Sequence, residues 1–272
     1  MQKFSYHTHT NALGIFDGRC TAEQMIEQAQ KIGYREIGIS NHLVYHPNMT
    51  IRHPMFFNDY NLLEDAMMRV ADEIRQAAST ATIKVYLGFE VDFFPSSEWR
   101  RCFEKLRKKI NADYYIGSFH YLRNQDESRV ENMYLYNPLQ PTYSEEEIKE
   151  AIHFYWQNAA LAAESGYFDF IAHPDVYKIF PHFAAYGEEE DKWHFIETMG
   201  RLKHPYELNT SGWRKCGEQH PYRWMMEELN RLEVPIVISD DAHDVSQLAN
   251  YFEQAEQLLQ SLDYKKRWKL EK

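Results

Sequence analysis

The sequence predicts an α/β fold, a variant of the (β/α) barrel formed by a single domain over residues 1–272. Short apolar, β-rich segments alternate with longer segments of helical period, which is typical of βα units and a parallel sheet. Seven strands of this kind suit a closed or nearly closed barrel better than a two-layer fold. No Ser/Gly/Pro-rich linker or change of composition divides the 272 residues, and this favours one domain over two.

The first βα unit begins with a predicted strand over residues 3–9, which ends in a polar loop. Thr21 and Gln24 then form a capping box, the pattern of a helix N-terminus. Gly33 ends this helix, and a second strand over 36–40 follows at once. The apolar face of the helix consists of Met25, Ile26, Ala29 and Ile32.

Two longer helices are predicted in the middle of the chain because apolar residues recur there at spacings of three or four. The first leads into a strand over 84–93, and a fourth strand runs over 114–119. Ser144 and Glu147 form a second capping box, and the helix that they begin precedes a fifth strand over 169–172. The inward faces are Leu63, Met67, Val70 and Ile74 in one helix and Ile148, Ala151, Ile152, Tyr155 and Ala159 in the other.

The last part of the chain supplies two more predicted strands, over 206–209 and 236–239. Between these two strands, His220 and Pro221 indicate the start of a helix. Residues 123–143 are polar and predict a long surface loop, a candidate lid. The final helix presents Leu248, Phe252, Ala255, Leu259 and Leu262.

Composition excludes several classes of function. Lys and Arg number 30 against 41 Asp and Glu, a formal net charge of −11, which argues against a dedicated nucleic-acid-binding protein. We find no apolar segment of about 18 residues and no signal-peptide core, so no membrane partner is expected. The three cysteines are Cys20, Cys102 and Cys216, which lie far apart and form no Cys-x-x-Cys pair. This is typical of a protein in a reducing compartment, so we expect a soluble cytoplasmic protein.

Residues able to bind metal ions follow almost every predicted strand, at the barrel face where active sites form. Residues two apart on a strand point to the same side, so His7 and His9 can bind one ion. Imidazole and carboxylate without thiolate suit Zn, Fe, Mn or Co, and Glu90 is the natural carboxylate to bridge two ions. The full set from strand ends is His7, His9, His42, Glu90, His120, His173, Asp241 and His243.

Each of these residues also has a structural interpretation. A His-x-His pair occurs by chance, and a single buried histidine is more often a hydrogen-bonded core residue than a ligand. The gathering of so many histidines at strand ends nevertheless favours a metal site. For the other seven of the 13 histidines we expect structural or solvent-exposed roles: His46, His53, His153, His182, His194, His204 and His220.

Eight segments, in the same order, resemble the polymerase-and-histidinol-phosphatase (PHP) family of metallophosphoesterases, and most closely its monofunctional histidinol-phosphate phosphatases. Any one segment is weak evidence, but together they span residues 6–243, nearly the whole chain. The segments are Tyr6–Thr10, Phe16–Gly18, Ser40–His42, Gly88–Asp92, Gly117–His120, Ile171–Asp175, Glu207–Gly212 and Ser239–His243.

The resemblance implies a distorted seven-stranded TIM-like barrel that holds three divalent ions of Zn, Fe or Mn. Asp17 lies in a loop and is implied as a ligand by the resemblance alone. The family pattern has an aspartate two residues before the histidine, which selects Asp241 and leaves Asp240 as a reserve candidate or supporting residue. The implied ligand sets are His7, His9, Glu90 and Asp241 for one ion, Glu90, His120 and His173 for a second, and Asp17, His42 and His243 for the third.

The implied activity is hydrolysis of a phosphate monoester, L-histidinol phosphate, to L-histidinol and phosphate in histidine biosynthesis, with water activated by the metals. Arg214 and Lys178 are candidate phosphate-binding residues, and Asp92 or Glu131 is a candidate for the substrate's ammonium group. The catalytic role, exerted through the metals, is assigned to His7, His9, Glu90, His120, Asp241 and His243.

Three alternatives remain open from the sequence. The substrate could be a nucleotide, a sugar phosphate or a phosphotyrosine protein, and the chain could instead be a non-catalytic, metal-stabilised interaction module. An amidohydrolase-like barrel also begins with His-x-His, but it needs a bridging lysine after a middle strand, and no lysine ends the fourth strand here.

Overall fold

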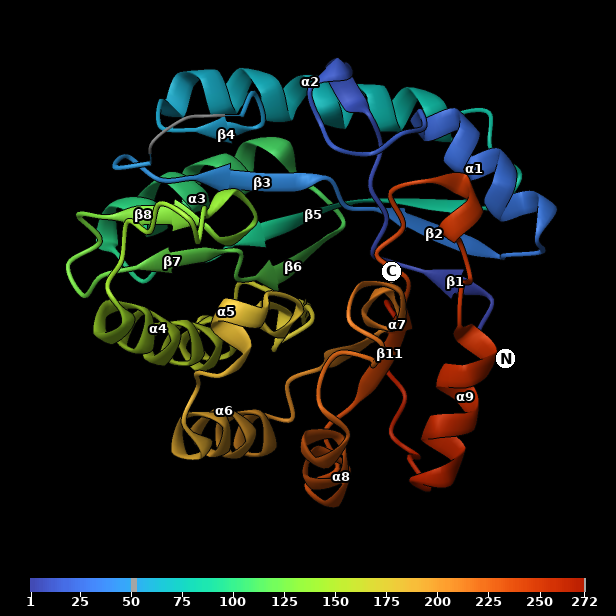
Figure 1. Cartoon of the computed structure of the whole chain (residues 1–272). Coiled ribbons are helices and arrows are strands. Elements are labelled where there is room, and N and C mark those ends of the chain that lie inside the picture. Colours follow the sequence, from blue (N-terminus) through green and yellow to red (C-terminus); the bar gives the residue numbers. More distant parts are fainter. Residues whose placement is uncertain (50–52, 272) are drawn as a thin grey trace.

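The computed structural model describes residues 1–49 and 53–271. Seven strands form the continuous path of a nine-stranded parallel sheet, which curls into a nearly closed barrel (Figure 1). This confirms the predicted fold class. In spatial order, which is also their chain order, the strands are β1 (Phe4–Ser5), β2 (Glu36–Ile39), β5 (Lys84–Asp92), β6 (Tyr114–Ser118), β9 (Phe170–Ile171), β10 (Tyr206–Asn209) and β11 (Ile236–Ser239).

The first and last strands meet through contacts that close the barrel. Thr8 forms an isolated parallel bridge with Ala242, and the backbone N–H of His9 donates to the Ala242 carbonyl at 2.8 Å. The predicted strand over 3–9 is shorter in the structure because side chains take over the hydrogen bonds of its second half. The Ser40 hydroxyl oxygen, for example, accepts from the backbone N–H of Thr8 at 3.2 Å.

Aromatic side chains fill the barrel interior. Tyr114 lies fully inside it, and its hydroxyl donates to the Tyr6 carbonyl at 2.5 Å. Glycine is required on two neighbouring strands, since a Cβ at Gly38 or Gly88 would overlap the Tyr114 ring. The C-terminal segment packs against the same interior cluster through Leu270.

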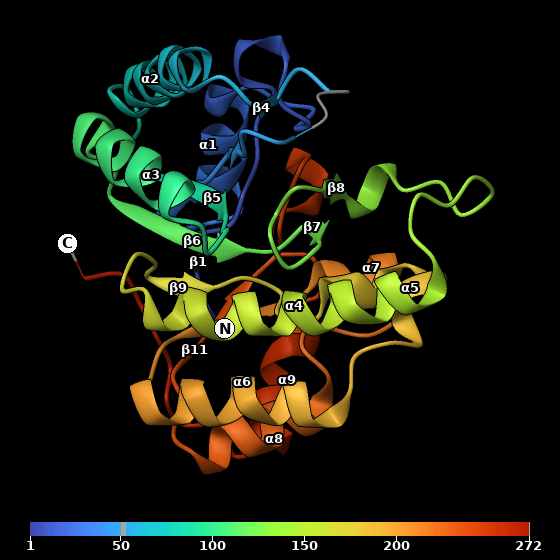
Figure 2. The same cartoon turned by 90° about the vertical axis from the view of Figure 1, so that its left-hand side faces the viewer.

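Helices cover the outside of the sheet (Figure 2). The capping boxes predicted at Thr21 and Ser144 are both present: each side chain accepts from the backbone N–H of the third helical residue, whose own side chain accepts from the capping residue's backbone N–H. None of the described helices is long and apolar enough to cross a membrane. The longer helices are α1 (Ala22–Lys31), α2 (Tyr60–Ala78), α3 (Ser97–Ile110), α4 (Glu145–Glu164), α6 (Glu189–Leu202), α8 (Arg223–Arg231) and α9 (Phe252–Ser261).

Several elements differ from the prediction. The segment over 123–143 is not one long loop, because it contains β8 (Val130–Asn132), which pairs antiparallel with β7 (Tyr121–Arg123). The helix expected at His220 begins later, at Arg223 in α8, after a cis peptide before Pro221. Also outside the prediction are β3 (His42–Tyr45), β4 (Phe56–Phe57), α5 (Pro181–Ala184) and α7 (Ser211–Lys215).

Candidate metal centre

Nine side chains from the predicted set converge at the C-terminal ends of the strands. Parallel strands bring these ends to one face of the barrel, so residues far apart in sequence become neighbours. Their donor atoms form four overlapping groups able to hold a metal ion: His9, Asp17, His42 and His243; His7, Glu90 and His173; His7, His9 and Asp241; His42, Glu90 and His120.

Glu90 lies at the centre of the cluster, on β5, with only 1% of its side chain exposed. Its Oε1 atom is 2.9 Å from His173 Nε2 and 3.5 Å from His120 Nε2. Its Oε2 atom is 2.9 Å from His42 Nδ1 and 3.4 Å from His7 Nε2. The carboxylate therefore faces imidazoles on both sides, the arrangement that a bridging carboxylate requires.

The adjacent aspartates after β11 point in different directions. Asp241 has a positive φ of 48°, and its Oδ1 atom is 3.2 Å from His9 Nε2. Asp240 accepts instead from the Ser5 hydroxyl and from the backbone N–H of Ala249, each at 2.8 Å. Burial raises the pKa of Asp240 to about 6. Asp241 alone of the pair faces the histidines.

Asp17 completes the outer side of the cluster from a loop. Its Oδ2 atom is 3.4 Å from His42 Nε2 and 3.2 Å from His243 Nε2. The next residue has to be glycine, because a Cβ at Gly18 would overlap the backbone of Thr10. Close packing of the loop on the Thr10 backbone thus brings Asp17 to the site, and the family resemblance was the sequence signal for it.

Unsatisfied buried atoms indicate that the cluster fits metal ions. Within the described chain, both ring nitrogens of His9, His7 Nε2, His42 Nδ1 and Glu90 Oε2 are buried without a hydrogen-bond partner. Each such atom costs about 1–3 kcal/mol unless something binds it. Burial, reinforced by nearby His243 and His42, lowers the pKa of His9 to about 3, so its ring is neutral and able to ligate.

Two carboxylates outside the predicted set hold the ligand rings in place. Glu207 Oε2 lies 2.9 Å from His7 Nδ1, and Glu207 Oε1 accepts the backbone N–H of His173 at 2.8 Å. Asp92 accepts the backbone N–H of His120 and lies 3.1 Å from its Nδ1 atom. Such partners orient metal-binding histidines. The sequence signal that could have identified Glu207 is its position as the charged residue of a predicted strand, Tyr206–Asn209.

A cavity of about 420 Å³ opens over the cluster. Arg214 lines it, as predicted for a phosphate-binding residue near the site, and so do Arg19 and Lys215, which were not among the predicted site residues. The Lys215 ammonium lies 2.8 Å from Asp241 Oδ2. His53, for which a structural or exposed role is expected, also lines this cavity.

Lys178 does not line the cavity, contrary to the expectation that it binds phosphate. Its ammonium is buried, 2.9 Å from Asp175 Oδ2, and donates to the Gln219 carbonyl at 2.7 Å. His220 Nδ1 lies 2.6 Å from the other oxygen of Asp175. Lys178 and His220 therefore belong to a buried ion-pair network beside the site. His46 has a comparable structural partner, since its Nε2 atom lies 2.8 Å from Glu127.

Comparison with known proteins identifies the class to which this metal-binding barrel belongs. The sequence model of the PHP domain matches residues 5–209, and the chain belongs to the PHP family. A protein of Deinococcus radiodurans named "Probable histidinol-phosphatase" is 29% identical over 174 residues, which are 64% of this chain. The match covers 63% of that relative, less than two thirds of its length.

Two solved structures share the fold. One, from Listeria monocytogenes, has a TM-score of 0.67 at 18% identity and covers 92% of this chain and 99% of its own. The other is a histidinol phosphate phosphatase from Lactococcus lactis in complex with zinc, L-histidinol and phosphate. It has a TM-score of 0.66 at 16% identity and covers 97% of this chain and 95% of its own.

Proposed function

We propose that this chain is a metal-dependent phosphomonoester hydrolase that converts L-histidinol phosphate and water to L-histidinol and phosphate. The observation that carries the proposal is the convergence of five histidines on one buried carboxylate, Glu90, in a cavity whose lining also includes Arg19, Arg214 and Lys215. In this proposal residues 1–272 act as a single domain in the cytoplasm, in histidine biosynthesis.

Three divalent ions of Zn, Fe or Mn would be held by the nine converging side chains. Bound ions of this kind supply positive charge for phosphoryl oxygens and lower the pKa of the attacking water. In the structure His9 is near both Asp241 and the group around Asp17, so it is close to two of the proposed positions. The proposed ligands are His7, His9, Asp17, His42, Glu90, His120, His173, Asp241 and His243.

The chain's own residues bind and orient the substrate. Arg19 and Arg214 line the cavity and carry planar guanidinium groups, which match pairs of phosphoryl oxygens. Lys215 is fixed by Asp241 and adds a third positive charge to the same wall. Glu207 and Asp92 hold the rings of His7 and His120, which keeps the ligand geometry constant during turnover.

The relatives support histidinol phosphate as the substrate. A curated relative bears the histidinol-phosphatase name, and the Lactococcus lactis enzyme was solved with L-histidinol and phosphate. These similarities favour an amino-alcohol phosphate over a nucleotide, a sugar phosphate or a phosphotyrosine protein.

The test is phosphate release from L-histidinol phosphate by metal-free protein titrated separately with Zn, Fe and Mn, with bound metal measured in parallel. We expect activity to rise with metal content and to reach its maximum near three ions per chain. Nucleotides, sugar phosphates and phosphotyrosine peptides are compared under the same conditions. A metal-saturated chain that hydrolyses none of these esters would contradict the proposal.

A further inference from the structure

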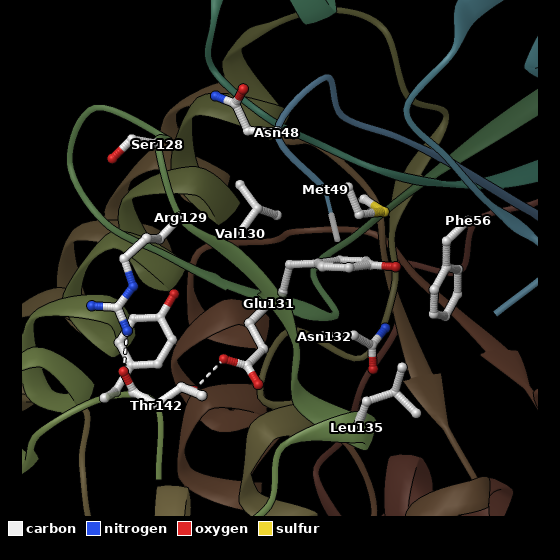
Figure 3. Close-up of a pocket in the computed structure, with 12 residues that line it drawn as sticks. Asn48, Met49, Phe56, Ser128, Arg129, Val130, Glu131, Asn132, Leu135 and Thr142 are labelled. Atoms are coloured by element: carbon white, nitrogen blue, oxygen red, sulfur yellow. Dashed lines mark hydrogen bonds between the residues drawn. The ribbon is translucent and has the colours of Figure 1, made fainter. Parts of the chain in front are cut away.

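A second cavity, of about 230 Å³, is lined in part by residues of the β7–β8 hairpin. Figure 3 shows the residues that line it. The two cavities are neighbours, since four residues line both of them. A ligand whose phosphoryl group lies over the metal centre can extend toward the second cavity along this shared wall. The shared residues are Phe56, Tyr121, Asn132 and Leu135.

A carboxylate without a cationic partner lines the second cavity. Glu131, on β8, accepts a hydrogen bond from the Thr142 hydroxyl, as Figure 3 shows. Over residues 1–49 and 53–271, no lysine, arginine or histidine forms an ion pair with it. The nearby Arg129 is already engaged, because it lies 2.7 Å from Glu147 and 4.0 Å from the centre of the Tyr143 ring. Glu131 therefore keeps its negative charge available to a ligand.

Aromatic side chains form other parts of the cavity wall. Tyr143 is only 4% exposed, and its hydroxyl has no hydrogen-bond partner among the described residues. The rings of Phe56 and Tyr121 meet edge to face at 5.9 Å. Aromatic rings attract cations, and a buried hydroxyl gains free energy when a ligand binds it. The cavity thus suits a small cation.

The other acidic candidate for the substrate's ammonium group is already occupied. Both oxygens of Asp92 face His120, one accepting its backbone N–H at 2.6 Å and the other lying 3.1 Å from Nδ1. A cation drawn to Asp92 would compete with these bonds. Glu131 makes no contact with the proposed ligands and can bind a cation without disturbing them.

We propose that Glu131, Tyr143 and the shared aromatic wall form the subsite for the cationic leaving group of the phosphate ester. The amino group pairs with Glu131, and the rest of the leaving group lies against Tyr121 and Phe56. This inference rests on the proposed phosphatase function and adds to it the residues that select a cationic amino-alcohol ester over a neutral one.

The experiment compares two esters and one product in the metal-loaded protein. The variant Glu131→Gln removes the charge with little change of shape, and Glu253→Gln, on an exposed face of α9, is the control of equal charge change. Turnover is measured with L-histidinol phosphate and with p-nitrophenyl phosphate, which lacks an amine. Calorimetric binding of L-histidinol gives a readout independent of turnover. Tyr143→Phe tests the free hydroxyl separately.

For Glu131→Gln we expect kcat/KM for L-histidinol phosphate to fall by about tenfold or more, and the Kd of L-histidinol to rise by a similar factor. Turnover of p-nitrophenyl phosphate stays unchanged, and the control variant behaves as wild type. Equal losses on both esters, or unchanged binding of L-histidinol, overturns the subsite. If the wild-type chain hydrolyses neither ester, the phosphatase proposal fails, while the binding comparison still decides the role of Glu131.

Discussion

Glu207→Gln is expected to weaken metal binding although Glu207 is not among the proposed ligands. Its carboxylate accepts from the backbone N–H of His173 and from the Asn209 amide, at 2.8 and 2.7 Å, and lies 2.9 Å from His7 Nδ1. A glutamine can keep the bonds to Oε1, but its amide then presents a donor to His7. His7 would have to move its proton to Nε2, the atom that faces Glu90 and Asp241.

The size of the effect follows from the bond that is lost. A buried hydrogen bond to a charged group contributes about 1.5–3 kcal/mol, which corresponds to roughly a 10- to 150-fold change in affinity. Removal of a carboxylate that supports a metal-binding histidine typically costs about 10- to 100-fold in metal affinity or activity. Both routes therefore predict a loss of at least about tenfold.

The assay is equilibrium dialysis of wild type and Glu207→Gln against buffered Zn, with bound metal measured directly and phosphate release measured alongside. We expect lower occupancy at limiting Zn and a partial return of activity at high Zn. Glu253→Gln again controls for the change in net charge. Wild-type Zn affinity in Glu207→Gln would refute the assignment of His7 Nε2 as a ligand atom oriented by Glu207.

Four further predictions concern residues outside the ligand set. Arg214→Met should raise KM for L-histidinol phosphate by about tenfold. Lys178→Met should instead lower the urea midpoint of unfolding, because it leaves Asp175 buried without this partner, at a cost of about 3–5 kcal/mol. A raised KM in Lys178→Met together with a lowered urea midpoint in Arg214→Met would contradict both assignments. Gly88→Ala should destabilise the fold by about 1–3 kcal/mol or more in calorimetry because its Cβ overlaps Tyr114, and an unchanged Tm would refute that packing. Burial lowers the pKa of His204 from 6.5 to about 4, so the unfolded state binds more protons at this residue between these pH values, and the contribution of His204 to stability falls by about 2 kcal/mol from pH 7 to pH 5. Urea titrations of wild type and His204→Gln at both pH values should differ by this amount, and an equal pH dependence of the two proteins would argue against it.

Local chemistry explains how much of the fold was predictable. The capping box at Thr21 and the one at Ser144 depend on residues three apart, so sequence alone reveals them. Strands 206–209 and 236–239 agree with β10 and β11 because each is a short apolar segment between helices. The hairpin of β7 and β8 escaped prediction, since each strand has only three residues, too few to show a periodicity.

The sequence by itself determined that metal-binding residues would gather on one face, because parallel strands place their C-terminal ends together. Only the tertiary structure decided which of those side chains contact one another and which face the cavity. It placed His9 next to the Asp17 group, and it showed Lys178 paired with Asp175 while Lys215 faces the cavity. It also left Glu131 without a cationic partner among the described residues. Such outcomes depend on side-chain directions and on contacts between segments distant in the chain, which no local spacing encodes.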